Sequence, residues 1–255
     1  MTATPAGMTY ADYLKLDPLL SAQQPLSDLH DEMLFIIIHQ AKELWMKELL
    51  HELRYAVMLV EADRFAEAYK VMSRISKIQA VMTLSWDVLS TLTPVDYLKF
   101  RSVLGTSSGF QSAQFREIEF RLGIKDPNFV NHYAEGSEER ARLVQALSEP
   151  SLREASHSAL ERAGFDLGDC SVDAISKAWL EVYRDAERCF DLYELAEKLV
   201  DIDDALAGWR HKHVLTVERI IGNKTGTGGS AGAPYLRATL EKRAFPELWS
   251  LRTEL

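Results

Sequence analysis

The stretch DEMLFIIIHQAKELWMKELLHELRYAVMLVEA, residues 31–62, decides the fold class because its apolar side chains recur at helical spacing. Intervals of three, four or seven residues separate Leu34, Ile38, Trp45, Leu49, Leu53, Ala56 and Val60. That spacing places these side chains on one stripe of a helix with 3.6 residues per turn. Ser27 or Asp28 is the candidate N-cap, and acidic residues follow in the first turn, where the helix dipole favours them. We therefore predict a long amphipathic helix.

The same periodicity continues along most of the chain. Residues 64–92, 171–202 and 203–222 each predict a long helix, and shorter helical segments fit PVDYLKFRSVLG, SAQFREIEFRLG and EERARLVQAL. The alternation typical of strands is missing, and most glycines and prolines lie between the periodic segments. We expect an all-α fold: a single-domain helical bundle with several long core helices over residues 21–255, preceded by an N-terminal arm, residues 1–20.

Composition excludes several classes of protein. The chain has 255 residues, of which 47% are hydrophobic, enough for a sizeable core. Its formal net charge of -9 argues against nucleic acid, which is bound by clustered Lys and Arg. Two cysteines provide neither a disulfide framework nor a cysteine-based zinc site. The longest apolar run, MLFIII, is too short to span a membrane, and the N-terminus lacks signal-peptide features. We expect a cytoplasmic protein with no membrane or nucleic-acid partner.

A second informative stretch, HKHVLTVERIIGNKTGTGGSAG, residues 211–232, joins two histidines to a glycine-rich loop. Residues 226–231 match the loose pattern G-x-G-x-x-A, but that pattern indicates nucleotide binding only between a strand and a helix. His211 and His213 are two residues apart, so on a helix they point to nearly opposite sides. Only His213 continues the apolar stripe of Leu206, Trp209, Val217 and Ile220. Its ring nitrogens need a partner there, and a haem iron or a backbone carbonyl would serve.

A di-iron centre is a competing interpretation. Glu48 and His51, and again Glu154 and His157, have the Glu-x-x-His spacing that carboxylate-bridged di-iron bundles use. However, His51 falls opposite the apolar stripe of its helix. The second pair lies in a polar, serine-rich stretch, and both observations disfavour a di-iron site.

Longer segments carry a family resemblance. The segments are YADYLKLDPLLSAQQPLS, HDEMLFIIIHQAKELWMKELLHEL, FRSVLGTSSGFQSAQFREIEFRLG, and WRHKHVLTVERIIGNKTGTGGSAG followed by YLRATLEKRAFPELWSLRTEL. In this order, and over almost the whole chain, they resemble tryptophan 2,3-dioxygenases, the haem enzymes that open the indole ring. The region between about Asp126 and Ser171 is short for that family.

The resemblance implies an activity, cofactors and an assembly. It implies insertion of both atoms of O2 across the indole C2–C3 bond of L-tryptophan, or of a close indole amino acid, to give N-formylkynurenine, the first step of the kynurenine route. It further implies one haem b per subunit, ferrous in the active state, O2 as co-substrate, and a homotetramer built as a dimer of dimers. Two alternatives stay open. One is a related haem oxygenase of specialised metabolism that inserts one oxygen atom into a substituted tryptophan, and the other is a non-enzymatic haem sensor.

The resemblance also implies residue roles. His213 matches the axial ligand of the haem iron, with Trp86 and Ser108 beside the haem. His39 matches the catalytic histidine that meets the indole N–H. The implied substrate-binding residues are Phe35, Ile36, Ile37, Ile38, His39, Tyr97, Arg101 and Thr227, together with Tyr10, Tyr13 and Leu14 from a neighbouring subunit.

Spacing supports several of these roles independently. Phe35 and His39 lie four residues apart and share a helix face, as do Tyr97 and Arg101. An arginine offers a planar fork that suits a carboxylate, and glycines around Thr227 let the loop approach a ligand and close over it. Taken alone, Phe35 and Tyr97 favour core packing, Arg101 favours a surface or intersubunit salt bridge, and the arm favours packing on its own bundle.

Overall fold

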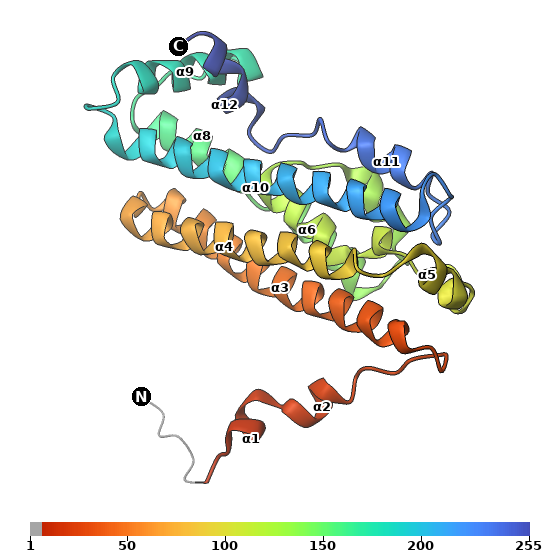
Figure 1. The fold of residues 1–255 in the computed structure, drawn as a ribbon. Coiled ribbons are helices and arrows are strands. Elements are labelled where there is room, and N and C mark those ends of the chain that lie inside the picture. Colours follow the sequence, from red (N-terminus) through yellow and green to blue (C-terminus); the bar gives the residue numbers. More distant parts are fainter. Residues whose placement is uncertain (1–6) are drawn as a thin grey trace.

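Long helices form the centre of the computed structural model (Figure 1): α3 (His30–Glu61), α4 (Phe65–Leu89) and α10 (Phe190–Ile221). Helix α4 packs along both α3 and α10 and so joins the other two long helices. The structure describes residues 7–255, and that range contains helices and turns but no strand. The all-α prediction is confirmed.

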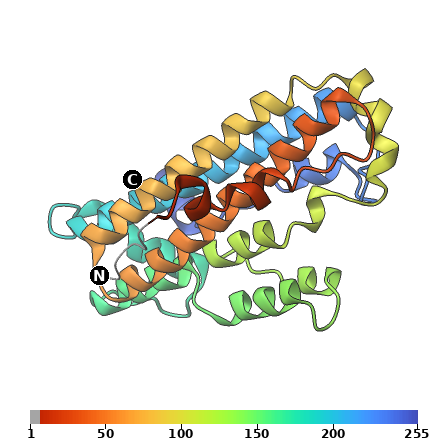
Figure 2. The ribbon, with the colours of Figure 1, turned by 90° about the horizontal axis from the view of Figure 1, so that it is seen from below.

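Shorter elements pack around these three helices. Along the chain they are α5 (Pro94–Phe100), η1 (Arg101–Leu104), η2 (Gly109–Gln111), α6 (Ala113–Leu122), η3 (Pro127–His132), α7 (Glu138–Ser148), α8 (Leu152–Arg162), α9 (Val172–Arg184), α11 (Ala233–Ala238), α12 (Pro246–Ser250) and η4 (Leu251–Thr253). Helices α6 and α8 pack on α3, and α7 packs on α6, so all three lie along one side of the long helices (Figure 2). None of the described helices is long and apolar enough to cross a membrane.

The predicted apolar stripe of α3 is correct over most of the helix but wrong at one position. The side chains of Leu49, Leu53, Ala56 and Val60 are all buried. Trp45 is instead 41% exposed, because in this part of the helix the side chains of Lys42 and Met46, 3% and 5% exposed, face inward. The N-cap prediction was also wrong, since the cap residue is Leu29. The turn before the helix is instead held by Glu32, whose carboxylate accepts the backbone N–H groups of residues 26 and 27.

The boundary predicted between residues 202 and 203 was wrong as well. Helix α10 runs without interruption through this point, and the break lies earlier, between Arg184 and Phe190. Asp203 does not cap a helix. Its fully buried carboxylate accepts hydrogen bonds from the backbone N–H groups of Ala244 and Phe245 and from the indole of Trp249. Asp203, the first residue of the predicted helix 203–222, therefore anchors the C-terminal segment to the bundle.

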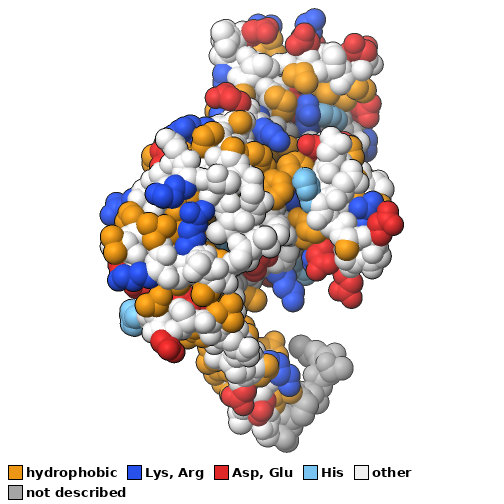
Figure 3. Space-filling view, turned by 90° about the vertical axis from the view of Figure 1, so that its right-hand side faces the viewer, with side chains coloured by type: hydrophobic (Ala, Val, Ile, Leu, Met, Phe, Trp, Pro, Cys, Tyr) orange, Lys and Arg blue, Asp and Glu red, His pale blue; other side chains and the backbone are white. Residues whose placement is uncertain are grey.

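The N-terminal arm stands away from the bundle (Figures 1 and 3). It contains two short helices, α1 (Tyr10–Leu14), whose N-cap Thr9 forms a capping box with Asp12, and α2 (Leu16–Leu20). Neither helix has a buried residue, and Tyr10 and Tyr13 are each 74% exposed. The first six residues of the predicted arm lie outside the described residues. Within the chain shown here, the arm does not pack on its own bundle.

Candidate functional site

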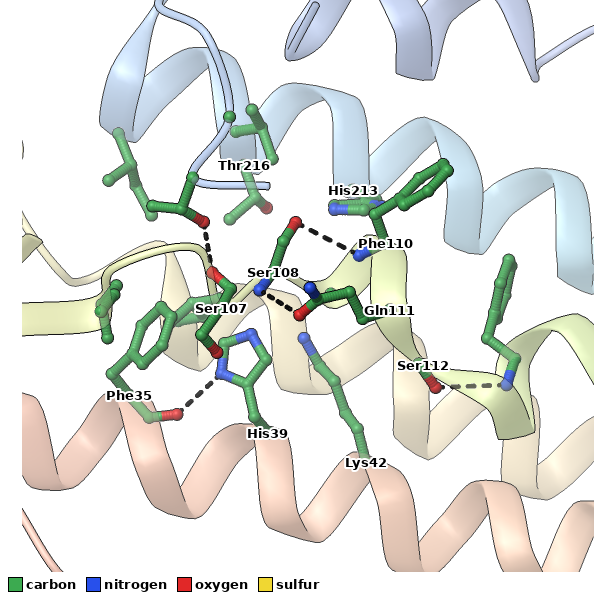
Figure 4. A pocket seen from close by; sticks show the side chains of 18 of the residues that line it. Phe35, His39, Lys42, Ser107, Ser108, Phe110, Gln111, Ser112, His213 and Thr216 are labelled. Carbon is green, nitrogen blue, oxygen red and sulfur yellow. Dashed lines mark hydrogen bonds between the residues drawn. The ribbon is translucent and has the colours of Figure 1, made fainter. Parts of the chain in front are cut away.

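A cavity of about 690 Å³ lies between α3 and α10, within the range of pockets that enclose small ligands and cofactors (Figure 4). The two long helices supply opposite walls. The remaining wall comes from three segments: the end of α4, residues 103–112, which begin within η1, and residues 222–232, the glycine loop between α10 and α11. Because α4 packs along both long helices, it holds them at the separation that leaves this space.

Helix α3 presents Phe35, His39 and Lys42 to the cavity, since spacings of four and three residues place them on one face (Figure 4). The Nδ1 atom of His39 lies 2.7 Å from the backbone carbonyl oxygen of Phe35. A carbonyl can only accept, so Nδ1 carries the hydrogen and Nε2 keeps a free lone pair. Burial lowers the pKa of His39 to about 4, and the nearby Lys42 lowers it further while the Phe35 carbonyl opposes the change. His39 is therefore a neutral acceptor at pH 7.

Helix α10 presents His213 from the opposite wall (Figure 4). Its ring stacks on Trp86, with centroids 4.3 Å apart and planes 10° apart, and lies 5.3 Å from the ring of Trp209. Burial lowers the pKa of His213 to about 3, with smaller contributions from Lys42 and His39. Within the described part of the chain, neither ring nitrogen of His213 makes a hydrogen bond. A neutral imidazole with an uncommitted nitrogen is the form that ligates a metal.

Unpartnered polar atoms in the wall indicate what the cavity accepts. Four buried side-chain nitrogens that line it have no hydrogen-bond partner among the described residues: Lys42 Nζ, Trp86 Nε1, Arg116 Nε and Trp209 Nε1. All four are donors, so they cannot satisfy one another. Haem fits this site, since it is flat and mostly apolar, takes an axial imidazole and carries acceptor carboxylates.

Aromatic side chains close the cavity near His39. Phe35 lies 5.9 Å from the ring of Tyr97 and 5.7 Å from that of Phe100. Tyr97, 8% exposed, follows the Thr93 cap and Pro94 that start α5. This corner offers flat apolar walls next to the one free acceptor of His39, an arrangement suited to an indole ring.

The glycine loop lies against the segment before η2. The hydroxyl of Thr227 donates to the carbonyl of Ser107, and the guanidinium of Arg101 donates to the carbonyl of Thr225. A Cβ added to Gly228 would lie 2.6 Å from the Cβ of Ser108, closer than real contacts allow. The absence of a side chain at Gly228 therefore permits the two segments to meet.

The predicted site residues fall into two groups. Phe35, Ile36, His39, Trp86, Tyr97, Ser108, His213 and Thr227 all line the cavity. Ile37 is 47% exposed and Ile38 belongs to the hydrophobic core, so neither lines it. Arg101 lines an adjacent hollow, which it shares with Thr227, and its guanidinium reaches the glycine loop from there.

Sequence reasoning missed a set of charged residues in the wall. Glu119 accepts from Arg116 at 2.6 Å and from Arg210 at 2.7 Å, and all three side chains are buried. Lys42 has no such partner. The available signal was its spacing, because Lys42 follows His39 by three residues and therefore shares its helix face.

The di-iron alternative is not supported. His51 is exposed, and His157 bonds Glu247, which also pairs with Arg153. Across residues 7–255, no group of three or more His, Cys, Asp or Glu side chains is arranged to hold a metal ion.

Comparisons with known proteins agree on one family. A family model described as tryptophan 2,3-dioxygenase matches residues 1–168 and 167–255, and the break between the two matches lies at the end of the region predicted to be short. The chain is 57% identical to the tryptophan 2,3-dioxygenase of Caulobacter vibrioides over 97% of this chain and 98% of that protein. It is 51% identical to the enzyme of that name from Bacillus thuringiensis (97% and 93%) and 48% identical to that of Shewanella woodyi (97% and 91%).

Proposed function

The chain belongs to the tryptophan 2,3-dioxygenase family, and on that premise we propose that it inserts both atoms of O2 across the indole C2–C3 bond of L-tryptophan to give N-formylkynurenine. One observation carries the proposal: two neutral histidines, His39 and His213, face a single cavity from opposite helices. One has a free nitrogen for a metal, and the other has a free acceptor for an indole N–H.

His213 is the residue that would hold the iron of haem b, one haem in each subunit. Bound in its ferrous state, haem supplies the iron that activates O2. The protein orients the ligand, since stacking of His213 on Trp86 fixes the plane of the imidazole. The Ser108 cap of η2 holds the neighbouring wall segment in place.

His39 positions the substrate. Its Nε2 accepts the indole N–H, because Nδ1 is already committed to the carbonyl of Phe35. The ring of Phe35 packs on the indole beside it, and Tyr97 completes the apolar corner. These contacts would hold the indole by its N–H group and by the faces of its ring.

The amino-acid end of tryptophan is held by Arg101 and Thr227, which share the hollow at the edge of the cavity. The guanidinium gives the carboxylate a charge-assisted bond, which selects amino acids over plain indoles. When the glycine loop lies against Ser107 and Ser108, it covers the site and excludes water.

The arm completes the site of a neighbouring copy in this proposal. Tyr10, Tyr13 and Leu14 are exposed, and Tyr10 and Tyr13 are aromatic side chains that an isolated chain leaves in water. We infer a homotetramer, a dimer of dimers, in which this arm forms part of the partner's substrate wall.

The haem assignment is tested by spectroscopy. The purified protein should show the spectrum of a histidine-ligated haem. The His213→Gly variant should lose or strongly weaken it, and added imidazole should restore binding. The matched control is His211→Gly, an exposed histidine on the same helix, which should keep the spectrum. An unchanged Soret band in His213→Gly would overturn the assignment.

A further inference from the structure

Lys42 is a buried amine that the proposed reaction does not use. Its side chain points from α3 into the cavity, one turn after His39 (Figure 4). The residue is 3% exposed, and its Nζ atom has no hydrogen-bond partner in residues 7–255. Its Nζ atom lies over the ring of Trp86, 2.9 Å from the ring centroid. Burying an ammonium group without a counter-charge is costly, so the charged form of Lys42 is stable here only beside an anion.

The acidic side chains of the cavity wall are engaged elsewhere. Glu32 accepts the backbone N–H groups of the turn before α3, and Glu43 accepts the amide of Gln114. Glu119 is shared by two arginines. An anion that keeps Lys42 charged would therefore have to come from a bound molecule.

The groups that line the cavity with Lys42 indicate which kind of anion would bind there. The indole N–H groups of Trp86 and Trp209 line the same cavity and also lack acceptors. The ring centroids of Trp86 and Trp209 lie 5.4 Å apart, so the two indoles are neighbours in the cavity wall. An ammonium group with nearby N–H donors is a site for a carboxylate.

We propose that Lys42 binds a propionate carboxylate of the haem, and this inference rests on the proposed haem site. The two propionates are the anionic groups at the edge of the macrocycle, and the rest of that edge is apolar. The carboxylate of tryptophan is assigned to Arg101, which lies outside the cavity wall. Burial lowers the pKa of the unpartnered Lys42 to about 6, and a carboxylate beside it would reverse that change.

The test compares two ligands that differ only in their carboxylates. Full-length chain produced under haem limitation is titrated with hemin and with hemin dimethyl ester, and Soret absorbance gives both dissociation constants. In wild type the ester should bind at least about tenfold more weakly, as expected for one lost charge-assisted bond. In Lys42→Met, the dissociation constant of the ester divided by that of hemin should be smaller than in wild type by about the same factor.

Two controls keep the outcome interpretable. Lys47→Met removes an exposed lysine of the same helix and should leave the ratio at the wild-type value. Lys42→Arg keeps the cation and should preserve most of the preference for hemin over its ester. Circular dichroism checks that each variant is folded.

The result that overturns the inference is an equal ratio in wild type and in folded Lys42→Met. A shifted Soret band in Lys42→Met with hemin would also overturn it, because it would assign the lysine to the iron. These outcomes are distinct from failure of the proposed function, in which wild type itself binds neither ligand with a histidine-ligated spectrum.

Discussion

His39 and His213 illustrate how one residue type takes two roles through its neighbours. The carbonyl of Phe35 fixes the tautomer of His39 and leaves an acceptor facing the cavity. His213 makes no such bond within the described residues and stacks on Trp86 instead. The sequence predicted both histidines at the site. It did not predict the tautomer, because that depends on the rotamer that brings Nδ1 to the carbonyl one turn earlier.

The role of His39 leads to a substrate-dependent prediction. His39→Ala should lower kcat/KM for L-tryptophan about fivefold more than for 1-methyltryptophan, since one neutral hydrogen bond is lost only where the indole carries N–H. Steady-state kinetics on both substrates gives the comparison. His51→Ala, at an exposed position of the same helix, is the control. Equal losses on the two substrates would exclude the N–H contact.

Arg101 gives a second prediction at this scale. Arg101→Ala should raise KM for tryptophan by roughly tenfold to a hundredfold, because a hydrogen bond to a charged group contributes about 1.5–3 kcal/mol. Tryptamine, which lacks the carboxylate, should be used equally well by variant and wild type. Lys99→Ala removes an exposed positive charge from the preceding helix as a control. The contact between Arg101 and the substrate carboxylate would be refuted if KM for tryptophan stayed at the wild-type value.

At the scale of elements, periodicity in the sequence predicted the long helices. It did not predict where they end or which side chains face inward, because tertiary contacts determine both. Asp203 resembled a helix start in sequence, yet it accepts hydrogen bonds from a segment some forty residues later. Lys42 was missed for a related reason. Hydropathy favours an exposed lysine at that position, and only the packing of α3 beside α4 turns it into the cavity.

The glycine loop supports a prediction about closure. Gly228→Ala should raise KM for tryptophan, because the new Cβ would lie 2.6 Å from the Cβ of Ser108 and keep the loop from closing. The Soret band of the Gly228→Ala variant should match that of wild type, because His213 on α10 is not affected. Gly208→Ala is the matched control, since nothing lies within 4 Å of its added Cβ and alanine favours the helix. A normal KM in Gly228→Ala would show that closure does not require this contact.

For the molecule as a whole, the exposed arm predicts that assembly and activity are coupled. Deleting residues 1–14 should preserve the haem spectrum but lower tryptophan turnover and loosen the oligomer, measured by light scattering. The haem spectrum should be preserved because Tyr10 and Tyr13 are each 74% exposed, so their removal leaves no gap in the bundle of their own chain.

Subunit mixing tests whether the arm reaches a neighbour. After verified exchange, the deletion variant and Arg101→Ala should together turn over low concentrations of tryptophan faster than either variant alone, because one chain supplies the arm and the other supplies Arg101. The reference is the wild-type oligomer, in which every site has both the arm and Arg101. No recovery would mean that the arm serves its own subunit.

The central claim is that both atoms of one O2 enter the indole ring, and isotope labelling tests it directly. The purified protein, with its haem reduced once, is incubated with L-tryptophan under ¹⁸O2, and the product is analysed by mass spectrometry with and without added reductant. We predict N-formylkynurenine that carries two ¹⁸O atoms and continued turnover without further reductant. A product with a single ¹⁸O atom, formed only while reductant is supplied, would contradict the account.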